Sequence, residues 1–372
     1  MRILLISHDI FCLKVFMNRL LEIGLTSEMM EQANEFPSLT IGRVIAQFRS
    51  IYRVFTENGE CKAEVAGKFH HDAAYSFQYP VIGDFVLLDR DNDEHGNAII
   101  QHLLDRKSAF SRKTAGIKQE TQMVAANIDI VFVCMALNSD FNLRRLERYI
   151  AVTWDSGAIP VVVLTKADLC ENLASMIKEV ETVAVGIEII VTSSFQKDGL
   201  KPIQKYLKKG VTIAFVGSSG VGKSTMINLL LGQEIMATQS IRNDDRGKHT
   251  TTHRELFLLP SGGAVIDTPG MRELGLDSAD VSKTFTDIEE LALHCKFKDC
   301  THQHEPHCAV RKAIEGGILS EDRLESYQKL KKEAEYRGMN SRQIDKRKVD
   351  DMFSGFNGIK NAKKYIRSKK EW

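Results

Sequence analysis

A single phosphate-binding pattern constrains this chain more than any other feature. Residues 217–224 (GSSGVGKS) fit G-x-x-x-x-G-K-[ST] in full, between an apolar run at 211–216 and a helix-like segment at 224–231. The glycines let backbone N–H groups close on phosphate oxygens, Lys223 is placed to reach the β- and γ-phosphates, and the Ser224 hydroxyl is placed to bind Mg²⁺. The candidate phosphate-binding residues are Gly217, Ser218, Ser219, Gly220, Val221, Gly222, Lys223, Ser224 and Thr225.

The pattern of the chain around this loop predicts its fold. Near-continuous apolar runs alternate with helix-like segments such as 143–154 and 172–183. Strands that are apolar throughout lie in parallel sheets covered by helices on both faces. The pattern therefore predicts a doubly wound α/β domain over residues 127–275. The runs interpreted as its strands are 127–137, 159–164, 187–191, 211–216 and 264–266.

A second motif indicates a guanine nucleotide. The tetrapeptide TKAD, 165–168, ends the second of these runs, at the sheet edge where such domains bind ligands. The Asp168 carboxylate can accept hydrogen bonds from guanine N1–H and N2–H₂, a donor pair that adenine lacks, and an unpaired buried carboxylate discriminates strongly. The Lys166 stem would pack on the base, and Ser193 or Ser194 could offer a backbone N–H to O6. The candidate base-binding residues are Thr165, Lys166, Ala167, Asp168, Ser193 and Ser194.

A third motif, DTPG at 267–270, follows the run at 264–266. Asp267 is placed to hold Mg²⁺ through water and the Gly270 N–H to sense a γ-phosphate, because a Walker-B-type carboxylate usually follows the phosphate loop at about this distance. The order of the motifs is unusual, since the base-reading TKAD precedes the phosphate loop and DTPG comes last. The same site can assemble from this order if the domain is circularly permuted.

The segment between the phosphate loop and DTPG carries the candidate catalytic groups. Within GKHTTTH, Thr250 or Thr251 could cap Mg²⁺ and the γ-phosphate, and the length of this loop, 232–254, predicts order only when nucleotide or a partner binds. Met271 stands where many GTPases have a water-positioning glutamine, and its apolar side chain cannot orient water. We therefore expect slow intrinsic hydrolysis, with His249 as the candidate to position the water. The candidate catalytic residues are Lys223, His249, Thr250 and Thr251.

A cluster of cysteines and histidines predicts a metal centre. The pattern C-x₄-C-x-H-x₅-C spans 14 residues and offers a Cys₃His tetrahedral set, which binds zinc with no open position and is therefore structural. The other cysteines are scattered singly, which excludes a disulfide framework and suits a reducing compartment. The predicted zinc ligands are Cys295, Cys300, His302 and Cys308, with His294, His304 and His307 as alternative imidazoles.

The N-terminal third predicts β structure. Residues 41–56 are rich in Val, Ile, Phe and Tyr, Asn58-Gly59 is the strongest short hairpin signal, and 85–88 is another short strand. A five-stranded OB-type barrel fits the length, and an unspecified small β domain is the alternative. Residues 1–37 read as helical, and 280–335 as mostly helical around the metal cluster.

Charge and hydropathy set the remaining limits. The formal net charge is +1, but residues 323–372 carry 15 Lys and Arg against 7 Asp and Glu, and this basic tail indicates a polyanionic partner. No apolar run approaches the ~18–20 residues of a membrane span. The N-terminus also lacks the uninterrupted apolar stretch of a signal peptide. We expect a cytoplasmic protein with no membrane partner.

In combination, these motifs resemble the bacterial ribosome small-subunit-dependent GTPase A family of circularly permuted GTPases. The resemblance rests on TKAD, GSSGVGKST, KHTTT and DTPG in that order and on the cysteine cluster, and it covers about residues 38–335. It implies an OB-type β-barrel, a permuted GTPase domain and a helical zinc-binding domain. The expected segments are an extension at 1–37, the barrel at 38–106, the GTPase domain at 107–278, the zinc domain at 279–336 and a basic tail at 337–372.

The resemblance also implies a function. Members bind the small (30S) ribosomal subunit and 16S rRNA, assist late maturation of that subunit, help to release a ribosome-binding assembly factor, and hydrolyse GTP slowly unless the subunit stimulates them. We therefore expect GTP or GDP with Mg²⁺, one structural zinc per chain, and a monomer. Basic groups could meet RNA phosphates, and aromatic side chains could stack on bases, although we expect most of these aromatics in the core. The candidates are Arg43, Arg49, Arg53, Lys62, Lys68, Lys363, Lys364, Lys369, Lys370, Phe48, Tyr52, Phe55, Phe69 and Tyr75.

Two alternative functions stay open. One is a permuted GTPase that acts on the large subunit or on another RNA, against which the OB-like N-terminus and the Cys₃His cluster argue. The other is a GTP-binding RNA and zinc protein with little turnover, which Met271 favours and which the intact Lys223, Ser224 and Asp267 disfavour. Thr165 stands where most GTPases have asparagine, so we expect moderate guanine affinity.

Overall fold

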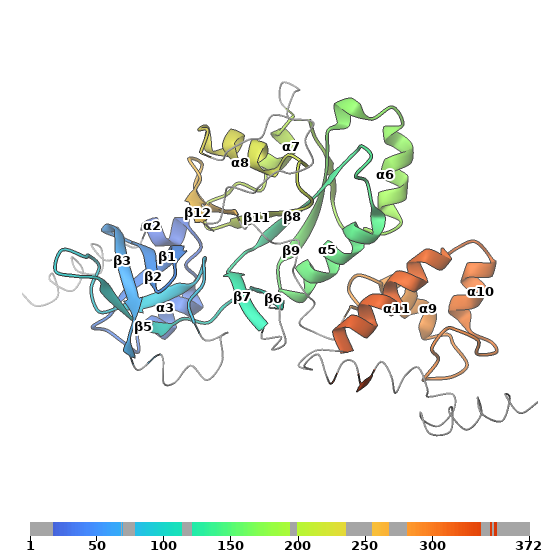
Figure 1. Ribbon diagram of the computed structural model, residues 1–372, viewed down its shortest axis with the longest axis horizontal. Helices are drawn as coiled ribbons and strands as arrows, with labels where there is room; N and C mark the ends of the chain where they lie inside the picture. Colours follow the sequence, from blue (N-terminus) through green and yellow to red (C-terminus); the bar gives the residue numbers. More distant parts are fainter. Residues whose placement is uncertain are drawn as a thin grey trace, which may run out of the picture.

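The computed structural model describes residues 18–67, 69, 79–113, 121–193, 199–235, 255–267, 281–335, 343 and 346–347, to which the following description is confined. A β-barrel, a central α/β domain and a group of helices follow one another along the chain (Figure 1). The barrel and the C-terminal helices lie on opposite sides of the central domain. Among the described helices, none has the length and apolar character needed to cross a membrane.

In the described residues, the N-terminal body is a closed barrel of five strands. They run in the order β1-β2-β3-β5-β4, β4 pairs back with β1, and neighbours are antiparallel except β3 and β5. Side chains such as Val44, Val54 and Ile100 fill its interior. The predicted OB-type barrel is therefore confirmed, in preference to an unspecified β domain. The strands are β1 (Thr40–Phe48), β2 (Ile51–Thr56), β3 (Gly59–Val65), β4 (Phe85–Leu88) and β5 (Ala98–Leu103).

The central domain is the predicted doubly wound sheet. Its described strands lie in the order β10-β9-β8-β11-β13-β12, all parallel except β12, which is antiparallel to β13. Two cores cover its faces, since α5 buries Leu146 and Ile150 in one and α8 buries Met226 and Ile227 in the other. The strands are β8 (Ile130–Ala136), β9 (Ile159–Thr165), β10 (Ile189–Val191), β11 (Thr212–Val216), β12 (Glu255–Leu258) and β13 (Ala264–Asp267). The helices are α5 (Leu143–Asp155), η2 (Ala167–Leu169), α6 (Leu173–Glu181), α7 (Lys201–Gln204) and α8 (Lys223–Leu231).

Strand β12 joins the central sheet to the barrel. It pairs with β1 at Ala46↔Glu255, so the barrel and the central sheet form one continuous hydrogen-bonded sheet. Arg53 of β2 adds an ion pair, with its Nη1 2.8 Å from Glu255 Oε1. This pairing places the barrel directly beside the strand that begins at residue 255. A separate hairpin is formed by β6 (Ala109–Lys113) and β7 (Thr121–Ala126).

Arg43 of β1 is buried at this junction. Its Nε donates to Gly83 O at 3.1 Å, and its Nη1 donates to Thr212 Oγ1 at 2.9 Å. Its guanidinium also donates to the backbone carbonyls of Ile23 and Asn127. Burial lowers the pKa of Arg43 to about 10, so the side chain stays charged at neutral pH. The expectation that Arg43 meets RNA phosphates is therefore wrong, because this side chain is fully buried and holds the barrel against the central domain.

Two helices precede the barrel, and the first of them contacts both the barrel and the central domain. They are α2 (Asn18–Glu22) and α3 (Ser27–Ala33). Leu20 is buried in the largest core, and the Glu22 carbonyl accepts from the N–H groups of Gly210 and Gly263 at 2.7 and 2.9 Å. Packing therefore continues on the N-terminal side of the barrel boundary predicted at residue 38.

The C-terminal helices dock on α5. Arg323 of α11, 3% exposed, donates to Glu147 of α5 at 2.9 Å and to the two carboxylate oxygens of Asp287 at 2.6 and 2.8 Å. Arg148 of α5 forms a bidentate pair with Glu333 of α11, both contacts being 2.6 Å. Hydrogen-bonded charges therefore cross the interface between the two domains. The helices are α9 (Thr286–Ala292), α10 (Ala309–Glu315) and α11 (Glu321–Glu335).

Candidate nucleotide site and metal centre

The phosphate loop connects β11 to α8. Gly217, Gly220 and Gly222 have φ angles of 149°, 72° and 102°, a region that favours glycine. A Cβ on Gly217 would lie 2.5 Å from the carbonyl oxygen of Cys134, so this strand end can pass β8 only as glycine. Lys223 begins α8, which brings its side chain and the N–H groups of the helix start to the same loop. Around them, Val221 is buried, Ser224 and Thr225 are half-buried, and Ser219 and Gly220 are exposed.

The Lys223 ammonium lies across the loop. Its Nζ donates to the carbonyl oxygens of Gly217 and Ser218 at 2.8 and 2.6 Å. The positive charge is thus held at the loop, where the phosphates of a nucleotide need it. The Ser218 hydroxyl donates to the carboxylate of Asp140, a contact that the sequence reasoning missed. The available signal was the position of Asp140, which follows β8 at the edge where such sheets bind ligands.

Asp267 ends β13, the neighbour of β11, and so lies on the same edge of the sheet as the phosphate loop. Burial raises the pKa of its carboxyl to about 6, while the charge of Lys223 acts to lower it. The influence of Lys223 indicates that these two groups share one electrostatic environment. An anionic Asp267 beside a lysine and a hydroxyl-bearing helix start is a suitable outer partner for a Mg²⁺-nucleotide.

The raised pKa gives a pH prediction for Mg²⁺ binding. A protonated Asp267 cannot accept a hydrogen bond from a Mg²⁺-bound water in the way that a carboxylate does. The Mg²⁺ concentration for half-maximal GTP binding should therefore rise as pH falls through about 6, by roughly tenfold per unit below that value. Titration of Mg²⁺ at pH 5, 6 and 7 measures this, with Asp267→Asn as the variant that should lose the dependence. A flat response in the unaltered protein would contradict the assignment.

The base-reading motif is bonded directly to the phosphate loop. Thr165, 4% exposed, ends β9, and its Oγ1 donates to the Val221 carbonyl oxygen at 2.8 Å. Lys166 follows with a left-handed φ of 57°, so the chain turns sharply after the strand. The Asp168 carboxylate then accepts from the Ser193 hydroxyl. Thr165, Asp168 and Ser193 therefore meet at the edge that carries the phosphate loop, and Ala167 begins the short helix η2 between them.

Thr165→Val tests this connection. Valine keeps the shape but leaves the Val221 carbonyl without its donor. This loss should reduce the free energy of nucleotide binding by about 1–2 kcal/mol, which weakens GDP and GTP binding alike by roughly 5–30-fold. Calorimetric titration with both nucleotides measures the change. Thr165→Ser, which keeps the hydroxyl, is the matched control and should bind nearly as tightly as the unaltered chain. Equal affinity of the valine variant would show that the two loops are positioned independently.

Several predicted site residues lie outside the described residues, and their roles stay predictions. They are Ser194, His249, Thr250, Thr251 and Gly270.

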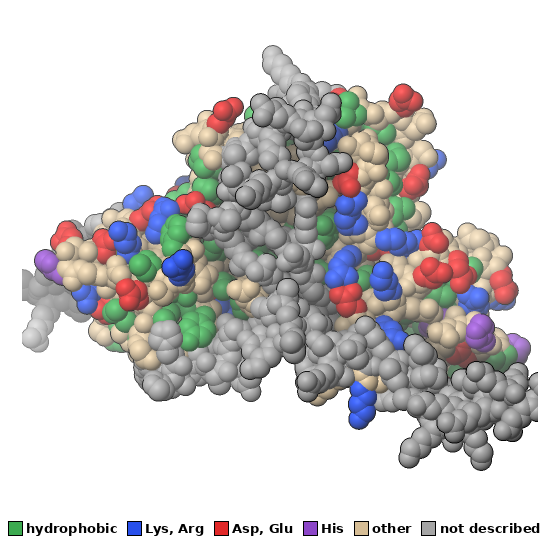
Figure 2. All heavy atoms as spheres, in the orientation of Figure 1, with side chains coloured by type: hydrophobic (Ala, Val, Ile, Leu, Met, Phe, Trp, Pro, Cys, Tyr) green, Lys and Arg blue, Asp and Glu red, His purple; other side chains and the backbone are tan. Residues whose placement is uncertain are grey.

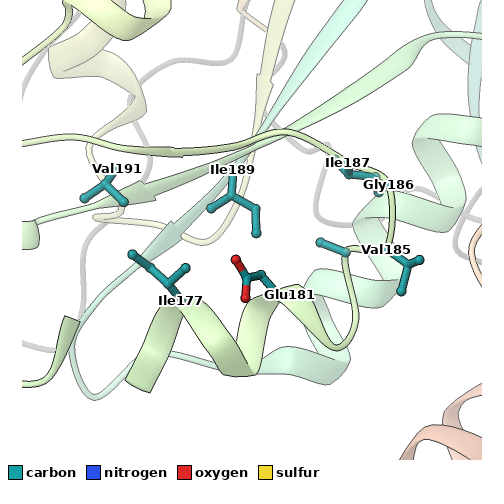
Figure 3. Close-up of a pocket in the computed structure, with 8 residues that line it drawn as sticks. Ile177, Glu181, Val185, Gly186, Ile187, Ile189 and Val191 are labelled. Carbon is teal, nitrogen blue, oxygen red and sulfur yellow. The ribbon is translucent and has the colours of Figure 1, made fainter. Parts of the chain in front are cut away.

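A hollow of about 440 Å³ lies elsewhere, between α6 and β10 (Figure 3). Ile177 and Glu181 of α6 point toward Ile189 of β10 across it. None of the residues predicted to bind nucleotide lines this hollow. The nucleotide site is therefore defined by its loops and hydrogen bonds.

The metal cluster assembles from the four predicted ligands. Their ligand atoms all lie within 4.8 Å of one another. Cys295 Sγ lies 3.8 Å from Cys308 Sγ and 3.7 Å from His302 Nδ1, and Cys308 Sγ lies 3.4 Å from His302 Nδ1. A tetrahedral zinc with bonds of about 2.3 Å to sulfur and 2.0–2.1 Å to nitrogen needs separations of this size. The donor set therefore fits zinc, and the alternative imidazoles are exposed and outside the cluster, namely His294, His304 and His307.

The fold and the site together define a circularly permuted P-loop GTPase, with an OB-type barrel before it and a Cys₃His cluster after it. Comparison with known proteins agrees. The model of the RsgA GTPase family matches residues 103–277, and an ABC transporter model matches 200–355, a span that includes the phosphate loop. The chain is 49% identical to "Small ribosomal subunit biogenesis GTPase RsgA 2" of Lactiplantibacillus plantarum over 92% of this chain and 97% of that protein. It belongs to the RsgA family.

Other relatives and solved structures agree with this assignment. "Small ribosomal subunit biogenesis GTPase RsgA" of Methanosarcina acetivorans is 40% identical over 87% of each chain. The crystal structure of YjeQ from Thermotoga maritima matches with a TM-score of 0.61 and 26% identity, over 80% of this chain and 99% of that one. YloQ, described as a circularly permuted GTPase, matches with a TM-score of 0.58 and 24% identity, over 80% and 95%. This last match supports the permuted fold.

Proposed function

We propose that this GTPase assists late maturation of the small (30S) ribosomal subunit and that the subunit stimulates its slow GTP hydrolysis. The names of its relatives support the small subunit as the partner, since these proteins are called small ribosomal subunit biogenesis GTPases. The observation that carries the GTP site is the 2.8 Å hydrogen bond from Thr165 to Val221, because it brings the base-reading loop and the phosphate loop into one site despite their permuted order.

The proposed chemistry is attack of water on the γ-phosphorus of GTP. The bond from this phosphorus to the β–γ bridging oxygen breaks, and GDP leaves with that oxygen. Asp168 holds the base, and Lys223 stabilises the charge that builds on the β- and γ-phosphates. The Ser224 hydroxyl and the Asp267 carboxylate would hold Mg²⁺, which would neutralise charge on the β- and γ-phosphates. The proposed partners of the γ-phosphate and of the attacking water are His249, Thr250, Thr251 and Gly270.

We further propose that the Cys₃His cluster holds one structural zinc per chain. Four protein ligands complete a tetrahedron, so no position remains for a substrate or a reactive water. Cys295 and Cys300 stand after α9, while Cys308 caps the N-terminus of α10, so the metal would fasten these two helices together. Metal analysis should find one zinc per chain, and a content well below that would contradict the site.

RNA contact is proposed for the barrel and the basic tail. On the barrel, Lys62 and Arg49 are exposed, and Phe48 is 40% exposed. Tyr52 and Phe55 are buried, so they are core residues and not stacking platforms. The face seen in Figure 2 mixes acidic and basic side chains over the barrel and the C-terminal helices. We therefore place the salt-sensitive part of binding to 16S rRNA largely in the tail at 337–372, in a cytoplasmic monomer.

Sedimentation with ribosomal subunits tests this proposal. The full chain loaded with a non-hydrolysable GTP analogue should pellet with small subunits and not with large ones, and a chain lacking residues 337–372 should lose part of that binding as salt is raised. Equal sedimentation with large subunits would favour the alternative of a permuted GTPase acting there. A ribosome-binding assembly factor already present on the small subunits should be released when GTP is hydrolysed.

A further inference from the structure

The loop that joins the second and fourth metal ligands is organised around one carboxylate. Oε1 of Glu305 accepts from the backbone N–H and the hydroxyl of Thr301, at 2.7 and 2.5 Å. Oε2 accepts from the backbone N–H groups of Gln303 and His304, at 2.9 and 3.1 Å. Three of the four donors are backbone N–H groups that lie on either side of His302 in the sequence. A single ionised side chain accepts all four hydrogen bonds.

The backbone that carries the imidazole needs such support. His302 has a φ of 60° and His307 a φ of 61°, a left-handed conformation that residues with a Cβ rarely adopt. His302 is nevertheless 6% exposed and turned inward, with its Nδ1 3.4 Å from Cys308 Sγ. A loop left to itself would relax out of this conformation, so some contact must hold it. The bonds to Glu305 begin one residue before His302 and resume one residue after it.

We propose that Glu305 is a positioning residue for the metal centre: it fixes the loop so that His302 points at the three thiols before the ion binds. This inference rests on the zinc site proposed above. Glu305 is not itself a ligand, because both of its oxygens are engaged by the loop and it lies outside the cluster of four ligand atoms. It acts through the backbone on either side of His302, as outer partners of metal ligands commonly do.

Asp299 provides a matched control. It is exposed, it lies immediately before Cys300, and it carries the same charge as Glu305. Among the hydrogen bonds of the described residues, the Asp299 carboxylate accepts none from a backbone N–H group. Asp299→Asn therefore removes one negative charge near the thiols and leaves the loop bonds intact. Glu305→Gln, in contrast, keeps the shape and one acceptor oxygen and loses the other.

The test measures metal affinity in the full-length chain. Competition for Zn²⁺ with a chromophoric chelator should give a dissociation constant raised about 10–100-fold in Glu305→Ala. The rise should be smaller in Glu305→Gln, and Asp299→Asn should stay within about twofold of the unaltered chain. The visible spectrum of Co²⁺ bound in place of zinc should change in Glu305→Ala as imidazole ligation is lost. GDP affinity, measured on the same samples, should be unchanged and shows that each variant is folded.

Three outcomes separate the claims. If the unaltered chain binds no zinc, the metal site itself is wrong. If it binds zinc and Glu305→Ala binds equally well with the same Co²⁺ spectrum, the site stands and the role of Glu305 is overturned. If Asp299→Asn weakens zinc as much as Glu305→Ala does, the effect is one of charge, and the positioning role is again overturned.

Discussion

Replacing Lys223 with alanine should lower the maximal rate of GTP turnover by about 10²–10³-fold. The reason is that the Lys223 ammonium is the cation held on the phosphate loop by the carbonyls of Gly217 and Ser218, at 2.8 and 2.6 Å. Charge that builds on the β–γ bridging oxygen in the transition state would lose its nearest stabilising group. Phosphate release under saturating GTP measures this, with and without the stimulating subunit.

The control is Lys178→Ala, which removes an exposed lysine from α6, away from the phosphate loop. It should leave turnover unchanged. Arginine in place of Lys223 should not rescue the rate, because its planar fork is larger than the ammonium that the loop carbonyls enclose. Full turnover by Lys223→Ala would remove the phosphate loop from the mechanism, and with it the assignment of the site.

Replacing Arg323 with leucine should lower the free energy of unfolding by about 3–5 kcal/mol. Arg323 is 3% exposed, and its loss breaks its ion pair with Glu147, which is 0% exposed and keeps only the Ser326 hydroxyl of α11 and Arg144 of its own helix as partners. Asp287 loses its two contacts at the same time. The effect should be confined to the C-terminal helices and their docking on α5, so thermal unfolding should split into two transitions. Limited proteolysis should release the C-terminal helices from the variant first.

The matched control is Arg311→Leu, which also removes a paired arginine from the C-terminal helices. Arg311 and Glu321 lie 2.6 Å apart, but their side chains are 36% and 51% exposed. Exposed pairs contribute about 0–1 kcal/mol, so this variant should unfold almost as the unaltered chain does. Equal destabilisation by both changes would mean that the burial of Arg323 does not account for its contribution to the docking of the C-terminal helices on α5.

The parts of the fold that the sequence predicts are those with local signals. The apolar runs became β8, β9, β10, β11 and β13, because a strand buried on both faces has to be apolar throughout. The sequence did not reveal β12 or the β6–β7 hairpin. Strand β12 is only Glu255–Leu258, with Leu256 alone fully buried, and one of its two partners, β1, lies some 200 residues earlier in the chain. Pairing at that separation leaves no local pattern.

In the candidate site too, residues with local sequence signals could be predicted and long-range contacts could not. Motif residues such as Lys223, Asp168 and Cys308 could be predicted, because their chemistry depends on short spacings within one loop. The bond from Thr165 to Val221 could not, since 56 residues separate them and only the permuted sheet brings them together. Arg43 shows the opposite error, because a basic residue on a barrel strand reads as an RNA contact until its burial is known.

The most direct test of the central claim is GTP turnover by the full chain alone, with small ribosomal subunits, and with large ribosomal subunits. The proposed function predicts slow turnover by the protein alone and stimulation by small subunits only. Stimulation by large subunits, or by neither while GTP still binds, would contradict the proposed role in small-subunit maturation and leave a guanine-nucleotide switch with a different activating partner.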